Sequence, residues 1–264
     1  MPENTLMKRL RRLWKDRPRP RELIVTDVTR MDGERVCVGG YLDDGAAVRP
    51  VAGRAGPNET WLRAAKNGPI APFSVVKLRV GWAPTGAVVP HSEDRAIPMR
   101  GHQVLRLLTE VEQKAILERT LSPSVRDIFG GEVLSDSQGQ WGRYVLAGTG
   151  ERSLGTIRAQ RISMVSYRHY PERGRWDYRL RFVDEAGEEF QLAVVDLAFR
   201  HRLDTLREGG LAPDAAARAV LDELRQQELF LRIGLARGWE KHPDRRYLQV
   251  TGVYGFTRGQ GDRG

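Results

Sequence analysis

The sequence predicts a mainly β protein with inserted helices, built from two small β-barrels in tandem. Short runs of β-branched and apolar residues, separated by turn residues, recur in both halves of the 264-residue chain. The longest single pattern is residues 178–196. There, apolar and arginine residues alternate before a turn of Asp-Glu-Ala-Gly, and the alternation resumes after it. This period of two predicts a β-hairpin with one apolar face inside and one charged face outside.

Residues 1–22 are expected to form a basic helix or arm. They hold eight lysines and arginines against three acidic residues. Apolar residues at helical spacing form one stripe of a short helix, and two prolines then end it. This helix either docks on the body through its leucines and Trp14 or contacts phosphate through Arg9, Arg11 and Arg12. Both interpretations stay open, and a helix lying on a membrane surface is a minor third.

The first barrel, followed by a helix, is expected within residues 23–121. Its strand-like runs are rich in β-branched and apolar residues, and turns such as Asp32-Gly33 and Gly68-Pro69 separate them. A helical pattern follows and ends before Pro123. We place the strands at residues 23–29, 35–41, 46–52 and 73–82, and the helix at residues 105–121.

The second barrel is expected within residues 151–256, after an irregular Gly- and Ser-rich connection at residues 122–150. A helix begins near Pro213, and Asp196 is expected to end a strand or cap a helix. The Gly-rich residues 257–264 are expected to form a flexible tail. We place the strands at residues 155–167, 228–238 and 247–256, with the hairpin of residues 178–196 among them.

An ordered series of short motifs resembles the dual OB-fold domain family of bacterial proteins. In the first half the series is Val36-Cys-Val-Gly-Gly-Tyr41, Val48-Arg-Pro-Val51, Trp61-Leu62, Pro72-Phe-Ser-Val-Val-Lys-Leu78 and His91-Ser-Glu-Asp94. In the second half it is Arg179-Leu-Arg-Phe182, Gln191-Leu-Ala-Val-Val-Asp196, Leu229-Phe-Leu-Arg-Ile-Gly-Leu235 and Tyr247-Leu-Gln-Val-Thr-Gly-Val253. The first half departs from the family pattern at Ala47, Val48 and Thr60. The resemblance implies two OB-like barrels, a nucleic-acid-binding role and frequent company with phage-defence or DNA-modification systems. It implies no catalytic residue.

The charge of the chain favours a polyanionic partner. The formal net charge is +9 and the pI is near 10.0. Such an excess favours nucleic acid or an acidic membrane surface as the partner, although generic solubility also accounts for some basic proteins. The single cysteine makes no internal disulfide, and no apolar run approaches the roughly 20 residues of a membrane span. No signal peptide is recognised, so we expect a cytoplasmic protein.

Aromatic and arginine residues interleave before and within the start of the predicted hairpin. A surface that stacks bases and follows a phosphate backbone needs this combination, although a solvated hairpin would also tolerate it. The candidates for nucleic-acid binding there are Arg168, Tyr170, Arg175, Trp176 and Arg179.

Two further candidates lie in the first half. Arg49 either pairs with phosphate or a base edge, or forms a structural bridge to a carboxylate such as Glu93 or Asp94, which we favour. Trp82 either stacks a base or packs in the core, whereas Trp61 is expected in the core.

The sequence contains no recognisable catalytic or metal-binding constellation, and no cofactor is expected. Signatures for ATP, dinucleotide binding and serine hydrolysis are missing, and the histidines are scattered. The sequence therefore predicts a protein without enzyme activity that binds single-stranded or opened nucleic acid as a targeting or scaffold subunit for a separate effector. The alternatives are a protein–protein adaptor or, less favoured, a cryptic nuclease using His91, Glu93, Asp94 or Asp196.

Overall fold

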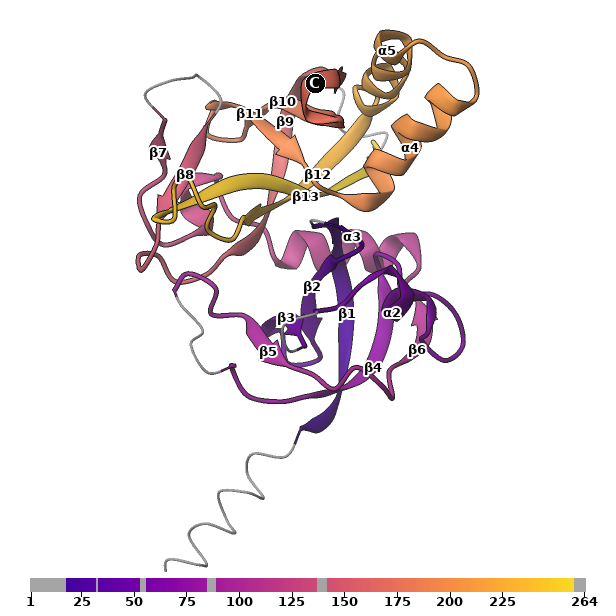
Figure 1. Ribbon diagram of the computed structural model, residues 1–264, viewed down its shortest axis with the longest axis vertical. Helices are drawn as coiled ribbons and strands as arrows, with labels where there is room; N and C mark the ends of the chain where they lie inside the picture. Colours follow the sequence, from indigo (N-terminus) through magenta and orange to yellow (C-terminus); the bar gives the residue numbers. More distant parts are fainter. Residues whose placement is uncertain (1–17, 32, 53–55, 85–88, 137–141, 259–264) are drawn as a thin grey trace, which may run out of the picture.

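The computed structural model describes residues 18–31, 33–52, 56–84, 89–136 and 142–258. The expectations about residues 1–17, which include Arg9, Arg11, Arg12 and Trp14, lie outside the described residues, as does most of the tail. The described chain is mainly β, as predicted. Its strands form two sheets, one above the other in Figure 1.

The first sheet has the strand order β5-β3-β2-β1-β4-β6. It closes because β5 pairs in parallel with β3, while Ala96 in β5 bonds through its backbone to Gly81 and Trp82, directly after β4. β1 begins within the segment expected to be the basic arm, because residues 19–22 pair with β4. The strands are β1 (Arg19–Arg30), β2 (Val36–Leu42), β3 (Ala47–Val51), β4 (Ser74–Val80), β5 (Asp94–Ala96) and β6 (Gln103–Leu107).

Two helices accompany the first sheet. The short α2 (Glu59–Arg63) places Trp61 in the core, as predicted. α3 (Glu110–Arg119) begins at a capping box in which Thr109 and Glu112 satisfy each other's backbone N–H groups. The predicted helix at residues 105–121 was wrong at its start, because residues 103–107 pair with β4 as strand β6.

Five strands of the second half close into a barrel of order β11-β10-β9-β12-β13. Closure comes from a parallel pairing of β11 with β13, which sets Ala193 opposite Gln249. The predicted hairpin is confirmed as β10 and β11, with Leu180 opposite Leu192. A five-stranded barrel with helices between its third and fourth strands has the OB arrangement. The strands are β9 (Leu154–Tyr170), β10 (Arg175–Asp184), β11 (Glu189–Val194), β12 (Gln227–Leu235) and β13 (Arg245–Thr257).

The helices α4 (Leu197–Glu208) and α5 (Pro213–Leu224) connect β11 to β12 and lie on one side of the second barrel (Figure 1). The Asp196 carboxylate accepts the Ala198 N–H at 2.9 Å, which confirms the predicted cap. α5 carries Pro at its first turn, where proline costs no hydrogen bond, and buries Ala216, Ala217, Val220 and Leu224.

The segment at residues 122–150 contributes to the second core, although an irregular connection was expected there. It holds the 3₁₀ helix η1 (Arg126–Ile128) and the strands β7 (Leu134–Ser135) and β8 (Arg143–Leu146). β8 pairs with β13. Ile128, Phe129 and Val145 are fully buried in the same cluster as the barrel's own core residues. These side chains cover the barrel where the sequence pattern is too sparse to show a strand.

The two barrels share a buried polar contact. Asp27 of β1 pairs with Arg232 of β12 at 2.8 Å, and their side chains are 3% and 0% exposed. The end of β1 also bonds to the second barrel, since the Arg30 N–H donates to the Val195 carbonyl at 2.9 Å. A third apolar cluster, which includes Tyr41 and Phe230, lies across the same junction. The barrels therefore hold each other in one fixed arrangement.

Candidate nucleic-acid interface

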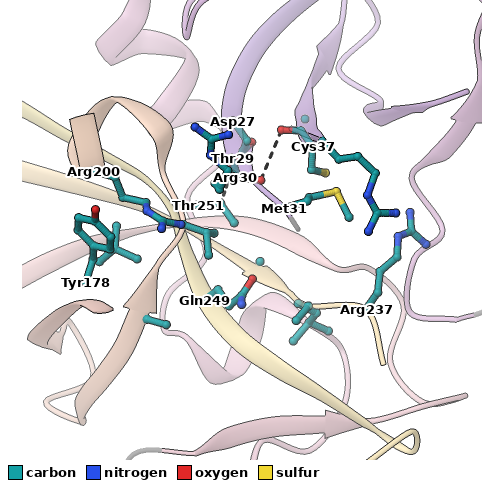
Figure 2. A pocket seen from close by; sticks show the side chains of 18 of the residues that line it. Asp27, Thr29, Arg30, Met31, Cys37, Tyr178, Arg200, Arg237, Gln249 and Thr251 are labelled. Atoms are coloured by element: carbon teal, nitrogen blue, oxygen red, sulfur yellow. Dashed lines mark hydrogen bonds between the residues drawn. The ribbon is translucent and has the colours of Figure 1, made fainter. Parts of the chain in front are cut away.

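A cavity of about 880 Å³ lies at the junction of the two barrels. The first barrel lines it with β1, β2, β3 and the turn between β1 and β2. The second barrel lines it with all five of its strands, with Arg200 of α4, and with residues just before β10 and just after β11 and β12. In both barrels the second and third strands are thus turned toward the same space. We call this cavity the groove (Figure 2).

The groove is strongly basic in composition. Its lining contains seven arginines but only two acidic residues and no lysine. In Figure 2, Arg200 and Arg237 lie on opposite sides of the view, with Met31 and Gln249 between them. The arginines are Arg30, Arg35, Arg49, Arg175, Arg179, Arg200 and Arg237, and the acidic residues are Asp27 and Asp177.

Some of these charges are already compensated within the protein. Arg179 pairs with Asp177 at 2.7 Å. Arg30 pairs with Glu59 at 2.5 Å. Among the described residues, Arg175 forms no ion pair. Arg49 and Arg237 share a single carboxylate, that of Asp94. The groove therefore keeps an excess of positive charge although four of its arginines are paired.

Arg200, on α4, is a second such cation. Its guanidinium lies over the Tyr178 ring, 4.4 Å from the ring centre, and the part of the chain that the structure describes gives it no ion pair. A guanidinium stacked on an aromatic ring keeps its N–H groups available at the edges of its plane. Arg200 is thus positioned to donate into the groove.

Four of the hairpin candidates share one face of the β9–β10 pair. Arg168 stands directly opposite Asp177, and Tyr170 stands opposite Arg175. Directly opposite residues on antiparallel strands lie on the same face. Arg179 joins them because it is two residues beyond Asp177 and bonds to it. The structure therefore brings Arg168, Tyr170, Arg175 and Arg179 together on the outer face.

Trp176 lies on the opposite face of β10 from these arginines. Its ring stacks on Tyr167 with the centres 4.4 Å apart, and Arg207 of α4 lies 4.5 Å from its centre. Asp204, also on α4, accepts hydrogen bonds from the hydroxyls of Tyr167 at 2.6 Å and Tyr178 at 2.8 Å. Trp176 is half-buried in this packing of α4 against the sheet and also lines the groove. The stacking on Tyr167 and Arg207 holds its ring in the fold.

Trp239 is an aromatic residue of the groove that the sequence analysis missed. It follows β12 in the loop before β13, lines the groove and is 52% exposed. Lys241 lies over its ring, with the ammonium 5.3 Å from the centre. An exposed tryptophan beside a lysine and a histidine, in a loop between two strands, was a pattern that sequence reasoning could have used. Arg30, Arg35, Arg200 and Arg237 were also missed.

Arg49 forms the buried bridge that one of its two interpretations predicts. Its Nε donates to Asp94 Oδ1 at 2.7 Å, and both side chains are 4% exposed. Arg237 donates to the other oxygen of Asp94 at 2.8 Å, so one carboxylate joins two guanidinium groups. Arg49 nevertheless lines the groove, and its Nη2 is buried with no hydrogen-bond partner among the described residues. Burial, with these two cations nearby, lowers the pKa of His91 to about 3.

The remaining candidates lie elsewhere. Trp82 is 60% exposed after β4 and does not line the groove. Glu93 accepts from the backbone N–H and the hydroxyl of Ser153, at 2.6 and 2.9 Å. Asp196 accepts backbone N–H groups of Ala198 and Val253. The described residues contain no cluster of three or more His, Cys, Asp or Glu side chains placed to hold a metal ion.

The dual OB-containing domain model matches residues 21–253. The chain belongs to this family. Several of the strands that carry the family motifs also line the groove, namely β2, β3, β10, β11, β12 and β13. No curated protein matches the sequence.

Two solved structures are similar to this dual OB chain at low identity. A replication protein A heterotrimer bound to ssDNA matches with 12% identity and a TM-score of 0.36, over 92% of this chain and 50% of that chain. The chain thus spans about half the length of that relative. A murine DNA-binding protein bound with double-stranded DNA matches with 9% identity and a TM-score of 0.29, over 90% of this chain and 97% of that one. Likenesses this distant say nothing about function. In the described part of the chain, no helix is long and apolar enough to cross a membrane.

Proposed function

We propose that the groove between the two barrels binds single-stranded or locally opened nucleic acid. The observation that carries this proposal is a cavity of about 880 Å³ lined by seven arginines and two aspartates. OB barrels bind oligonucleotides on the face of their second and third strands and on the loops beside it. Here both barrels direct that face into one space, where Arg175 and Arg200 have no ion pair among the described residues and Arg49 and Arg237 share one carboxylate.

The shape of the groove favours a single strand over a duplex. Its volume falls within the range of about 300–1,000 Å³ that is typical of small-ligand pockets. A few nucleotides of one strand fit this space, whereas a double helix would have to stay outside. Trp239 lines the groove, whereas Tyr170 lies outside its lining, on the outer face of the hairpin opposite Arg175, which does line it. Base stacking on such rings is worth about 1–3 kcal/mol per base.

The test is a fluorescence anisotropy titration of the full chain with a single-stranded DNA, a single-stranded RNA and a duplex at several salt concentrations. We expect a single strand to bind more tightly than the duplex, with affinity falling steeply as salt rises. The double variant Arg175→Gln/Arg200→Gln should reduce the slope of log K against log salt by about 1.4, which is about 0.7 for each lost phosphate contact. Arg218→Gln, an exposed arginine on α5, is the matched control and should leave the slope unchanged. The absence of affinity for all three ligands at low salt would overturn the proposal.

We also propose that the chain acts as a targeting or scaffold subunit for a separate effector of a defence or DNA-modification system. This proposal rests on the family of the chain and on the residues of the groove. The described part of the groove offers arginines and aromatic rings for binding, and no catalytic constellation was identified among them. Purification of the tagged chain from its native host tests it. A stoichiometric effector that remains after nuclease treatment is expected, and recovery of the chain alone would contradict it.

A second candidate function is docking to a protein partner. It has one observation in its favour: Leu105 and Leu107 on β6 and Val111 at the start of α3 are large apolar residues with exposed side chains. Such groups mark interaction sites when they lie together. Leu107→Glu should remove a protein partner from the purified complex without changing oligonucleotide affinity. Retention of the partner would argue against docking at this surface.

A further inference from the structure

One guanidinium nitrogen at the groove has no acceptor. Arg49 is among the most buried charged side chains of the first barrel, and its Nη2 is without a hydrogen-bond partner among the described residues. A buried donor of a charged group that lacks a partner loses its hydration without compensation, so such donors are rare in native proteins. Because Arg49 lines the groove, a ligand that enters the groove can supply the missing acceptor.

The groups around Arg49 favour a negatively charged acceptor. Asp94 is the carboxylate that bonds to both Arg49 and Arg237, so two positive charges share it. The nearby Glu93 is turned to Ser153, which occupies both of its oxygens. Arg237 also lines the groove and is 47% exposed, so part of its guanidinium faces solvent. Two guanidinium groups fixed by one carboxylate form a rigid pair of donors, which suits the several oxygens of a phosphate.

We infer that the Arg49 and Arg237 end of the groove binds a phosphate monoester, which is the terminal phosphate of a bound strand. This deepens the proposed function and rests on it. A phosphodiester inside a strand carries a nucleotide on each side, so the nucleic-acid strand must both enter and leave the place where that phosphate binds. A terminal phosphate is joined to the strand on one side alone, so the strand can reach the site from a single direction. This suits Arg49, whose side chain is 4% exposed. A mononucleotide carries the same monoester and can reach the same donors.

The experiment compares one oligonucleotide sequence with a 5′-phosphate, with a 3′-phosphate and with hydroxyl ends, by competition anisotropy. We expect one phosphorylated form to bind at least tenfold more tightly than the hydroxyl form, the size of one charge-assisted contact to a phosphate. A mononucleotide with the same phosphate, and inorganic phosphate at higher concentration, should reduce this advantage. Equal affinity of the three oligonucleotides would overturn the inference and leave the proposed function standing. No binding of any oligonucleotide would overturn the proposed function, and calorimetry with the mononucleotide would then decide whether the site takes a free nucleotide or nothing.

Variants locate the effect. Arg237→Gln should reduce the ratio of affinities between the phosphorylated and hydroxyl forms to near one. Arg49→Lys keeps a cation for Asp94 but removes the Nη2 donor, and it should reduce the same ratio. Arg175→Gln is the matched control, which should weaken both oligonucleotides equally and leave the ratio unchanged. If Arg49→Lys fails to fold by circular dichroism, Arg237→Gln alone decides, and an unchanged ratio in that variant would place the end phosphate elsewhere.

Discussion

Replacement of Arg232 by methionine should destabilise the protein strongly, because the arginine is the centre of the polar contact between the barrels. It donates to Asp27 at 2.8 Å, to the Tyr41 hydroxyl at 2.7 Å and to the Thr156 hydroxyl at 2.9 Å. Methionine fills a similar volume but donates nothing. The Asp27 carboxylate then stays buried with two hydroxyl donors among the described residues, from Thr26 and Thr251.

The magnitude follows from the burial of the pair. Removal of one partner from a buried ion pair typically costs about 3–5 kcal/mol, because the other charge is left uncompensated. For a chain of this size, each kcal/mol lowers the melting temperature by about 2–4 °C. We therefore expect Arg232→Met to melt roughly 10 °C below the wild type. The double variant Asp27→Leu/Arg232→Met removes both charges and should recover much of this loss.

Urea unfolding followed by tryptophan fluorescence measures the wild type, the single variants Arg232→Met and Asp27→Leu, and the double variant, which are the four forms of one double-mutant cycle. The expected coupling energy between Asp27 and Arg232 is about 2 kcal/mol or more. A single variant that loses less than about 1 kcal/mol, or a double variant no more stable than Arg232→Met, would refute the claim that charge compensation holds the barrels together.

Three other predictions concern acid stability, strand packing and the roles of two rings. His91 has a pKa of about 3 in the folded protein and about 6.5 in the unfolded chain, so the unfolded chain takes up the proton first and the free energy of unfolding falls as pH drops below 6.5. Between pH 6.5 and pH 4, His91→Leu should therefore lose up to about 3 kcal/mol less of this free energy than the wild type does. Urea melts in which both proteins show the same pH dependence would contradict this. In Gly40→Ala the new Cβ would lie 2.0 Å from the Ile24 carbonyl oxygen, so the variant should lose about 3 kcal/mol or more, and a wild-type melting temperature would count against the packing described. Trp176→Ala should lower the free energy of unfolding by about 3 kcal/mol and change oligonucleotide affinity less than twofold. Tyr170→Ala should weaken oligonucleotide binding about tenfold and leave the free energy of unfolding nearly unchanged. The reverse pattern would show that Trp176, and not Tyr170, stacks on a base.

The elements that depend on local pattern could be predicted from the sequence. The β10–β11 hairpin has a clear period of two and a turn that ends at Gly187, whose φ is +81°. The helix cap at Asp196 is equally local. The sequence analysis placed the start of α3 too early, at residue 105, although Thr109 and Glu112 have the spacing of a capping box. The apolar residues before Thr109 extended the helical pattern backward, and only their pairing with β4 decides that they form a strand.

The segment at residues 122–150 shows a different limit. Its buried side chains come from the pair Ile128-Phe129 and from isolated apolar residues among glycines and polar residues, so no period appears over the length of a strand. β8 exists because β13 offers it a partner edge, and β13 is about 100 residues further along the chain. Contacts of this range leave no local trace in one sequence.

The outer face of the hairpin could have been predicted more sharply. A period of two places Arg175 and Arg179 on one side of β10, and the same period places Trp176 on the other. The sequence analysis grouped the three residues because they are close in the sequence, whereas successive side chains of a strand point to opposite faces. The register with β9, which adds Arg168 and Tyr170 to the arginine side, needs the position of the turn and is fixed only by the fold.

The groove itself could not be predicted, because each of its functional contacts joins distant parts of the chain. Asp94 links Arg49 of the first barrel to Arg237 of the second, and Asp27 with Arg232 fixes how closely the barrels approach. The two contacts lie on the same junction, so the charge pair that stabilises the arrangement also sets the distance across which the groove arginines face each other. A ligand of the groove should therefore meet donors that are already in place, and its affinity should depend on Asp27 and Arg232 although both are buried.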